Sequence, residues 1–456
     1  MTPDSRIRYP ILMRRTRTLG LVLVLLLFAA RGLLAQTLTQ DAKNNVLKAL
    51  EVTVTRRAFV AGADFSKWPE YLEKHRKDID AATDVPSFTR EVNRAFREFG
   101  VSHLGLRSPR QFQSSRSTST VGIGVIARKE DEGLRVFAVL PTGPAASSGL
   151  EVGDVIVEVD GKPALSTDVL DGDEGSKLAV KVKKPSGEVK EIALERRRYS
   201  TIRPETLTWV DEEAAVLRIP TFNVGYNREA VEKLVEEAAR AKYLIVDLRS
   251  NGGGLVANMR HLLGLLLPEG SPIGTSVTKP MSERFVIATK GDPKDVVAIA
   301  KWVDSPQKTR RGRVDPFPGR IAVLINRGSG SASEITAAAL KEDAEALLVG
   351  TRSAGAVLTS LIQQLPEGFG LQYPVTDYIT AHGVRLEGHP LMPDIEVTAA
   401  NPGGPTPPPA SPGATRPDIV VERAVEKLRE ISATAHVPPG GTHVGSTNHG
   451  DYRLRG

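Results

Sequence analysis

One serine of this sequence has the setting of a nucleophile. Residues 321–335 read IAVLINRGSGSASEI, so that an apolar strand runs through a glycine and serine loop into a helix, with Ser331 at the junction. At such a junction a hydroxyl is exposed, and the amide of the next residue can help to polarise a carbonyl group. A serine in this place is more often only the N-cap of the helix. The motif alone therefore leaves both interpretations open.

A second apolar strand also runs straight into a glycine loop. Residues 243–254 read YLIVDLRSNGGG, and an apolar helix is expected at 255–267. The dinucleotide and phosphate-loop fingerprints both have a different spacing, and no lysine follows these glycines. Strand, glycine loop and helix can instead present backbone amides to an oxyanion.

Three further blocks, at 121–125, 141–150 and 153–162, resemble a PDZ domain of the bacterial type in content and order. The loop of Gly122, Ile123, Gly124 and Val125 can turn its amides inward and capture a terminal carboxylate, while an extended peptide adds beside it as a strand. A lone pair of glycines usually marks a tight turn. The accompanying blocks favour the PDZ interpretation and make this loop the expected peptide-binding site.

Together with the blocks at 346–355 and 386–397, these motifs resemble the carboxyl-terminal processing peptidases, also called tail-specific proteases. The resemblance covers about residues 41–400 and includes the family's order of helical segment, PDZ domain and catalytic core. It implies a serine endopeptidase that recognises substrate C-termini through the PDZ domain. Matching motif to motif places the nucleophile on Ser331 and the oxyanion donors on the amides of Ala332 and Gly253.

The chain departs from the best-known branch of this family at the general base. In that branch a lysine follows the glycine that corresponds to Gly355, whereas this chain has Ala356, which cannot accept a proton. The tricorn-type branch resembles it more closely, because it lacks the lysine and uses a histidine before the core. His103 matches that position, and its apolar neighbours favour the neutral imidazole that a base needs. Without the family motifs, such a histidine is more often a core or helix-end residue.

The third catalytic residue expected from the tricorn-like branch is Glu387, which would orient the imidazole. Asp377 and Asp394 are alternatives for this role. The competing candidates for the base are Lys341, His261, His382 and His389. Lys341 and His261 lie within predicted helices, where surface or packing roles are more common. His389 is close in sequence to Glu387 and is the stronger rival.

The resemblance implies serine-type peptide hydrolysis with protein or peptide substrates as partners, without nucleic acid and without a metal or an organic cofactor. In this scheme Ser331 attacks, His103 moves the proton and Glu387 holds the imidazole. The alternative is a catalytically inactive member that binds peptides or acts as a scaffold. The missing lysine favours the alternative, and the retained serine and glycine motifs oppose it. A crotonase-like acyl-coenzyme A enzyme ranks far below, since it has no use for a PDZ domain.

The elements that must position these residues fall into six segments. They are a signal peptide at 1–35, an N-terminal helical region at 36–115, a small PDZ domain of mostly strands at 116–198, a serine peptidase core at 199–400, a proline- and glycine-rich linker at 401–417, and a C-terminal helix with a disordered tail at 418–456. Strands and helices alternate in the core, which predicts a crotonase-like buried sheet layered with helices. The expected fold class is therefore α+β multidomain.

Composition and charge narrow the setting. The chain has 456 residues, 40% of them hydrophobic, and no cysteine, which excludes disulfides and thiolate nucleophiles. Its net charge of +6 suggests an acidic partner, but residues 1–35 alone carry six arginines and one acidic residue. With the apolar run at 21–30, this segment is typical of a secretory signal and is too short to span a membrane. Cleavage after Ala35 would give an exported, periplasmic or extracellular protein, with membrane attachment only if the segment is retained.

Overall fold

The computed structural model describes residues 38–398 and 418–435, which cluster into two compact units. The described parts of the first unit are residues 38–58, 64–112 and 362–373, and those of the second are 59–63, 113–361, 374–398 and 418–435. The predicted signal peptide at 1–35 and the predicted linker at 401–417 lie outside the described residues. Of the predicted C-terminal segment at 418–456, residues 436–456 also lie outside them. Within the described ranges, no helix is both long and apolar enough to cross a membrane.

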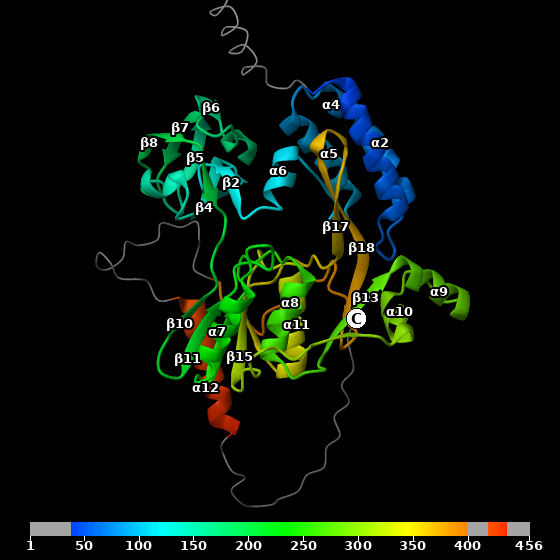
Figure 1. The fold of residues 1–456 in the computed structure, drawn as a ribbon, viewed down its shortest axis with the longest axis vertical. Helices are drawn as coiled ribbons and strands as arrows, with labels where there is room; N and C mark the ends of the chain where they lie inside the picture. Colours follow the sequence, from blue (N-terminus) through cyan, green and yellow to red (C-terminus); the bar gives the residue numbers. More distant parts are fainter. Residues whose placement is uncertain (1–37, 399–417, 436–456) are drawn as a thin grey trace, which may run out of the picture. The chain divides into compact units, whose positions relative to one another are not determined.

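The first unit is mainly helical (Figure 1). Its principal elements are α2 (Gln40–Arg57), α3 (Trp68–Lys74), α4 (Arg76–Ala81), α5 (Val85–Phe99) and β1 (Gly105–Arg107), which pairs with the first residues of β18 (Gly370–Thr380). In α5, Phe88, Val92 and Phe96 are buried on one face, as the apolar spacing predicts. The Asp84 carboxylate caps this helix, and Gly100, at φ 81°, ends it.

A small domain of strands occupies residues 119–200. Its main sheet has the order β3 (Val125–Glu130), β4 (Gly133–Val139), β5 (Val155–Val159), β7 (Lys177–Lys183) and β8 (Val189–Glu195), with β6 (Lys162–Pro163) beside β5. A separate ladder joins β2 (Ser119–Gly122) to β9 (Arg197–Ser200). The sequence predicts one strand over 121–127, but the chain turns there, because Gly124 adopts φ 80°. The turn separates β2 from β3, which lies at the edge of its sheet.

The core is a six-stranded sheet layered with helices. In spatial order its strands are β10 (Thr206–Trp209), β11 (Ala214–Arg218), β12 (Tyr243–Asp247), β15 (Arg320–Ile325), β16 (Leu347–Gly350) and β19 (Ile395–Glu396). All neighbours from β11 to β19 are parallel, and β10 is antiparallel to β11. Strands that are buried on both faces form continuous apolar runs, so the sequence predicts β12 and β15 as strands.

Helices cover both faces of this sheet. One face packs against α7 (Arg228–Ala238), α8 (Val256–Leu266) and α11 (Ala332–Ala344) through residues such as Leu244 and Val323. The other face packs against α12 (Ile419–Ala435), red in Figure 1, through alternate residues such as Ile245 and Leu324. The expected α+β multidomain class, with a helical region, a small domain of strands and a layered core, is therefore confirmed.

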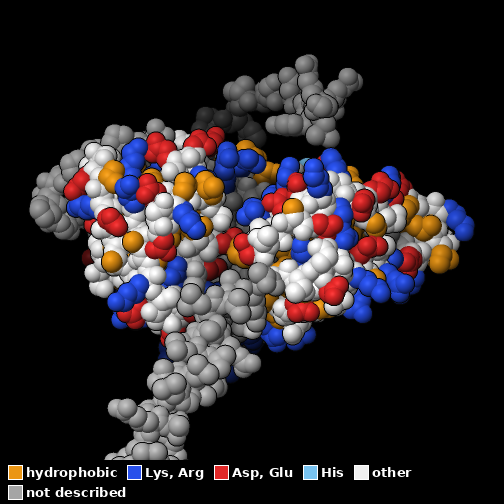
Figure 2. Space-filling view, turned by 90° about the horizontal axis from the view of Figure 1, so that it is seen from above, with side chains coloured by type: hydrophobic (Ala, Val, Ile, Leu, Met, Phe, Trp, Pro, Cys, Tyr) orange, Lys and Arg blue, Asp and Glu red, His pale blue; other side chains and the backbone are white. Residues whose placement is uncertain are grey.

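The second unit contains further elements that periodicity did not predict. They are β13 (Pro272–Thr278), α9 (Lys279–Thr289), α10 (Val296–Val303), β14 (Gln307–Lys308) and β17 (Thr359–Gln364). Residues 376–380 of β18 pair antiparallel with 274–278 of β13. Figure 2 shows one face of the molecule, on which basic and acidic side chains are intermingled.

Candidate active site

Ser331 lies at the turn where β15 leads into α11. Its backbone has φ 55° and ψ −119°, a conformation that residues other than glycine rarely adopt. Its amide donates to the Ala356 carbonyl at 3.0 Å and to Glu334 Oε2 at 3.1 Å, and the residue is half-buried. Strained backbone persists only where its surroundings impose it, and it concentrates at functional sites. The turn therefore sets Ser331 apart from an ordinary N-cap.

The buried carboxylate of Glu334 imposes this turn. Oε2 accepts the amides of Ser331 and Ala356, both at 3.1 Å, while Oε1 accepts the Gly355 amide at 2.7 Å and the hydroxyl of Ser353. Glu334 is fully buried, and these four donors occupy both of its oxygens. The carboxylate is thus an anchor between the start of α11 and residues 353–356, and it has no lone pair left to take the proton of Ser331.

The glycine loop after β12 packs directly on Ser331. Gly253 has φ 94°, and a Cβ added to it would lie 2.8 Å from Ser331 Cβ and from the Gly330 carbonyl oxygen. The same added Cβ would lie 3.0 Å from the Ala332 amide nitrogen. Only glycine combines this conformation with so close an approach. The glycine run is therefore required by its contact with the nucleophile turn.

Asn251 fastens this loop to the start of α11. Its carbonyl accepts the Gly330 amide at 3.1 Å and the Ser333 hydroxyl at 2.8 Å. Its fully buried side chain accepts the Gly253 amide at 3.0 Å and donates to the Ile219 carbonyl at 2.8 Å. The Gly253 amide is thus already bonded, so the geometry does not support the prediction that Gly253 itself supplies an oxyanion donor.

Two other amides beside the serine are better placed to meet an oxyanion. Ala332 opens α11, where amides have no partner within the helix, and no acceptor for its amide occurs among the described residues. Gly252 is exposed, with open space where a Cβ would stand. The Ala332 assignment is thus compatible with the geometry, and within the glycine run the available donor moves from Gly253 to Gly252.

Glu387 lies beside the same short loop as the nucleophile turn. Its Oε2 accepts the Val357 amide at 2.8 Å, and the Gly388 amide donates to the Gly355 carbonyl at 2.9 Å. Val357 directly follows Ala356, whose carbonyl accepts the Ser331 amide. The structure therefore brings Glu387 and Ser331 into contact with the same short loop, which contains Ala356.

His103 belongs to the first unit, whereas Ser331 and Glu387 belong to the second. It lies in the turn between α5 and β1, with φ 57°, and its Nδ1 is 2.8 Å from the Ser102 hydroxyl. Burial lowers the pKa of the imidazole to about 4. At neutral pH the ring is therefore uncharged and able to accept a proton.

Most of the competing candidates have partners of their own. Lys341 is paired with Asp394, Asp377 is paired with Arg385 at 2.6 Å, and the two ring nitrogens of His261 contact Tyr226 at 2.9 Å and Glu232 at 3.0 Å. His382 and His389 are exposed, and Nδ1 of His389 is 2.9 Å from the Glu387 carbonyl oxygen. His389 thus stays the rival nearest to the nucleophile loop.

The second predicted site, the loop from Gly122 to Val125, joins β2 to the edge strand β3. A Cβ on Gly124 would lie 2.5 Å from the Gly143 Cα, so this turn requires glycine. Burial raises the pKa of Tyr199, the charge of Asp171 acts in the same direction, and the tyrosine hydroxyl accepts the Gly124 amide. The loop is thus a tight glycine turn before an edge strand, and the amide of Gly124 is bonded to a phenol.

Two parts of the chain match known families. Residues 213–397 match peptidase family S41, and residues 135–184 match the PDZ domain. Among solved structures, mature CPAF complexed with lactacystin is similar in fold, with a TM-score of 0.51 and 14% identity over 87% of this chain and 99% of that chain.

Curated proteins with similar sequences carry related names. Carboxyl-terminal-processing peptidase 1, chloroplastic, from Arabidopsis thaliana is 25% identical over 75% of this chain and 69% of its own length. The chloroplastic C-terminal processing peptidase of Tetradesmus obliquus is 28% identical, covering 58% and 56%. A probable CtpA-like serine protease of Staphylococcus epidermidis is 22% identical, covering 72% and 63%. The chain thus spans between 56% and 69% of the length of these relatives.

The turn at Ser331, the glycine loop and the layered core together define a core of the S41 peptidase class. The chain thus has a core of peptidase family S41 and a PDZ domain, and its sequence is similar to those of carboxyl-terminal processing peptidases. The family expected from the motifs is thereby confirmed. At position 356 this chain has alanine instead of the lysine of the best-known branch.

The close packing of Gly253 predicts a sharp difference between two neighbouring glycines. Replacing Gly253 by alanine imposes both a left-handed backbone and a clash with the Ser331 turn, so we expect a loss of about 2 kcal/mol or more in the free energy of unfolding. The matched variant Gly252→Ala meets open space and should change it by no more than about 0.5 kcal/mol. Urea unfolding of both variants tests this, and equal losses would contradict the packing described.

The four bonds to Glu334 predict that its charge is needed for stability. In Glu334→Gln an amide nitrogen would face two hydrogen-bond donors, and we expect a loss of about 3 kcal/mol in the free energy of unfolding. Glu345→Gln, at an exposed position just after the same helix, is the matched control and should be nearly neutral. A Glu334→Gln variant as stable as this control would show that the carboxylate does not anchor the turn.

Proposed function

We propose that this chain is an exported serine-type endopeptidase of the carboxyl-terminal processing kind, hydrolysing proteins that it recognises by their C-terminal ends. The observation that carries the proposal is the turn at Ser331. Its strained backbone is held by Glu334 and Ala356, and the glycine loop packs against it. The bond to Glu334 also occurs in the capping box of an ordinary N-cap, but the left-handed backbone of Ser331 and the close packing of Gly253 do not belong to such a cap.

In the proposed reaction the Ser331 hydroxyl oxygen attacks the scissile carbonyl carbon, and its proton passes to the imidazole of His103. The amides of Ala332 and Gly252 would stabilise the oxyanion of the tetrahedral intermediate, and losing one such donor typically lowers turnover about 100-fold to 1000-fold. The imidazole then returns the proton to the leaving amine as the carbon–nitrogen bond breaks. Water, activated in the same way, releases the acyl group from the serine.

The proposed roles of His103 and Glu387 have separate support. The low pKa of the imidazole keeps it neutral under physiological conditions, as a base requires. Glu387 stands on the loop that also holds the Ser331 amide, which supports it as the residue that orients the ring. The Ser102 hydroxyl now contacts Nδ1, and Glu387 would have to replace or share that contact.

The PDZ domain is proposed to hold the substrate by its C-terminal end and so raise the local substrate concentration at the core. The glycine turn before β3 and the position of β3 at the sheet edge support this, since an extended peptide can add there as a further strand. A terminal carboxylate would compete with Tyr199 for the Gly124 amide. Export is proposed from the arginine-rich start and the apolar run at 21–30.

The second candidate is a catalytically inactive member that binds peptides, and Ala356 is the observation that favours it. Labelling with a fluorophosphonate probe separates the two. We expect the wild type to react, Ser331→Ala not to react, and His103→Ala to react at least about 100-fold more slowly, because the hydroxyl loses its base. His382→Ala, which removes an exposed histidine, should react like the wild type.

Two results of this labelling would change the assignment. If the wild type reacts no faster than Ser331→Ala, the chain is not a serine peptidase. If His103→Ala reacts at the wild-type rate, the base is another residue, and His389 and Lys341 are the next variants to measure.

The low pKa of His103 predicts an unusual pH profile for the labelling rate. Only the neutral imidazole accepts a proton, so the rate should fall as pH drops through about 4 rather than through the ordinary histidine value of 6.5. The folded pKa lies below the unfolded value, so the folded state should also lose stability as pH falls from about 6.5 towards 4. A labelling midpoint at 6.5 or above would exclude a buried His103 as the base.

A further inference from the structure

The C-terminal helix α12 lies beyond the matched S41 residues, 213–397, yet it is part of the core. Val420, Ala424 and Leu428 are buried on one stripe of the helix. They pack against the sheet face formed by residues such as Ile245 and Ala322. This helix closes one face of the sheet whose strands lead into the catalytic loops.

Asp418, the residue that precedes α12, has two tasks. Its Oδ1 accepts the amides of Val420 at 3.1 Å and Val421 at 3.4 Å and so caps the helix. The same carboxylate accepts both terminal nitrogens of the Arg249 guanidinium, Nη1 at 3.1 Å and Nη2 at 2.6 Å. Burial opposes the charge of Asp418, yet these bonds keep the pKa of its carboxyl below the usual value. The pair is therefore a two-bond, charge-assisted contact.

Arg249 connects this contact to the glycine loop. Its guanidinium also binds Asp247, the last residue of β12, through Nε at 2.9 Å and Nη2 at 2.8 Å. The next residue, Ser250, has φ 59° and donates its amide to Asn326 Oδ1 at 2.9 Å. Asn251 and Gly253, which pack on the nucleophile turn, follow directly. The arginine thus stands between the C-terminal helix and the loop beside Ser331.

We propose that Asp418 is a positioning residue, through which α12 fixes Arg249 and holds residues 250–254 against Ser331. The inference rests on the proposed function, because the effect on reaction is exerted through the loop that supplies the proposed Gly252 donor. Its structural part, that Asp418 limits motion of the loop, does not depend on activity.

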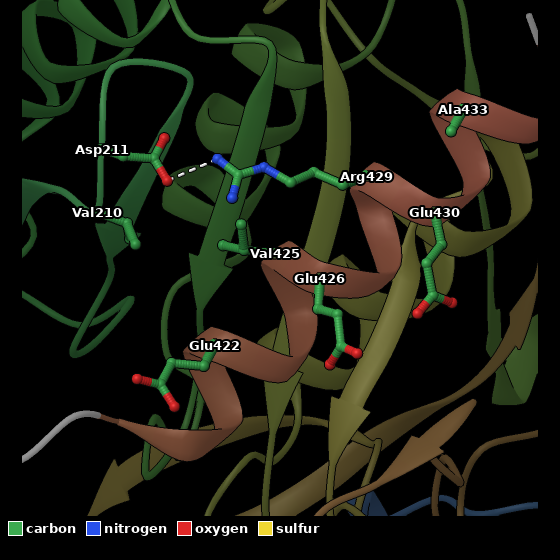
Figure 3. Close-up of a pocket in the computed structure, with 8 residues that line it drawn as sticks. All are labelled: Val210, Asp211, Glu422, Val425, Glu426, Arg429, Glu430 and Ala433. Carbon is green, nitrogen blue, oxygen red and sulfur yellow. Dashed lines mark hydrogen bonds and ion pairs between the residues drawn. The ribbon is translucent and has the colours of Figure 1, made fainter.

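The other end of α12 offers a matched control. Figure 3 shows Arg429 reaching from the helix to Asp211. Its Nη2 lies 2.6 Å from Asp211 Oδ2. Asp211 lies just before β11, whereas Arg249 lies just after β12, and these parallel strands are paired Ala214 to Tyr243 and Arg218 to Asp247. The two ion pairs therefore lie at opposite ends of the sheet, and only that of Asp418 adjoins the glycine loop.

The test compares Asp418→Asn with Asp211→Asn in the full chain. Asparagine is also a good N-cap, so Asp418→Asn removes the charge while α12 stays capped. We expect the maximal rate of fluorophosphonate labelling of Ser331 to fall at least about 10-fold in Asp418→Asn, with an unchanged half-saturating probe concentration. Asp211→Asn should label like the wild type, and Asp418→Glu, which keeps the charge, should recover most of the rate.

Hydrogen exchange of residues 249–254 provides a readout that does not need activity. We expect faster exchange in Asp418→Asn than in Asp211→Asn or the wild type. Equal exchange in all three proteins would overturn the proposal, as would equal labelling rates of the two asparagine variants when the wild type labels. If the wild type does not label at all, the proposed function fails, and the exchange result alone decides whether Asp418 holds the loop.

Discussion

The turn at Ser331 depends on one buried carboxylate. The two carboxylate oxygens of Glu334 accept four hydrogen bonds, which connect the first turn of α11 to residues 353–356. Burying a carboxylate without partners would be unfavourable in free energy. With four charge-assisted hydrogen bonds, the carboxylate instead holds the two backbone segments rigidly together. The strained backbone conformation of Ser331 persists because the Glu334 carboxylate holds its amide. The backbone of the proposed nucleophile is thus held by a residue that has no part in the proposed proton transfer.

The remaining constraints act on the same turn from other sides. Gly253 fills the space against Ser331, and Asn251 ties the glycine loop to the start of α11. Both strands that lead to these turns are buried between helices, so their ends have little freedom to shift. The site is therefore built from backbone amides on rigid elements, with few side chains free to move. Such a design suits a reaction in which charge develops on a carbonyl oxygen.

Much of the core could be predicted because its strands are continuous apolar runs that end in glycine loops. Those loops also located Ser331, and family motifs located Glu387. The strand β18 was missed, because two of its partners, β1 and β13, are distant from it in sequence. Glu334 was missed as well, since its four partners come together only in the folded state. For a similar reason, nothing in the sequence shows that the Asn251 side chain accepts the amide of Gly253, the predicted oxyanion donor.

The position of α12 at the end of the chain also bears on how the protein folds. The sheet face that includes Ile245 and Leu324 is covered only when Val420, Ala424 and Leu428 arrive. Ribosomes add roughly 5–20 residues per second, so this face stays uncovered for roughly 5 to 20 seconds after β15 has been made. Contacts between such distant segments also slow folding. The order of synthesis therefore leaves the core incomplete until α12 has been made.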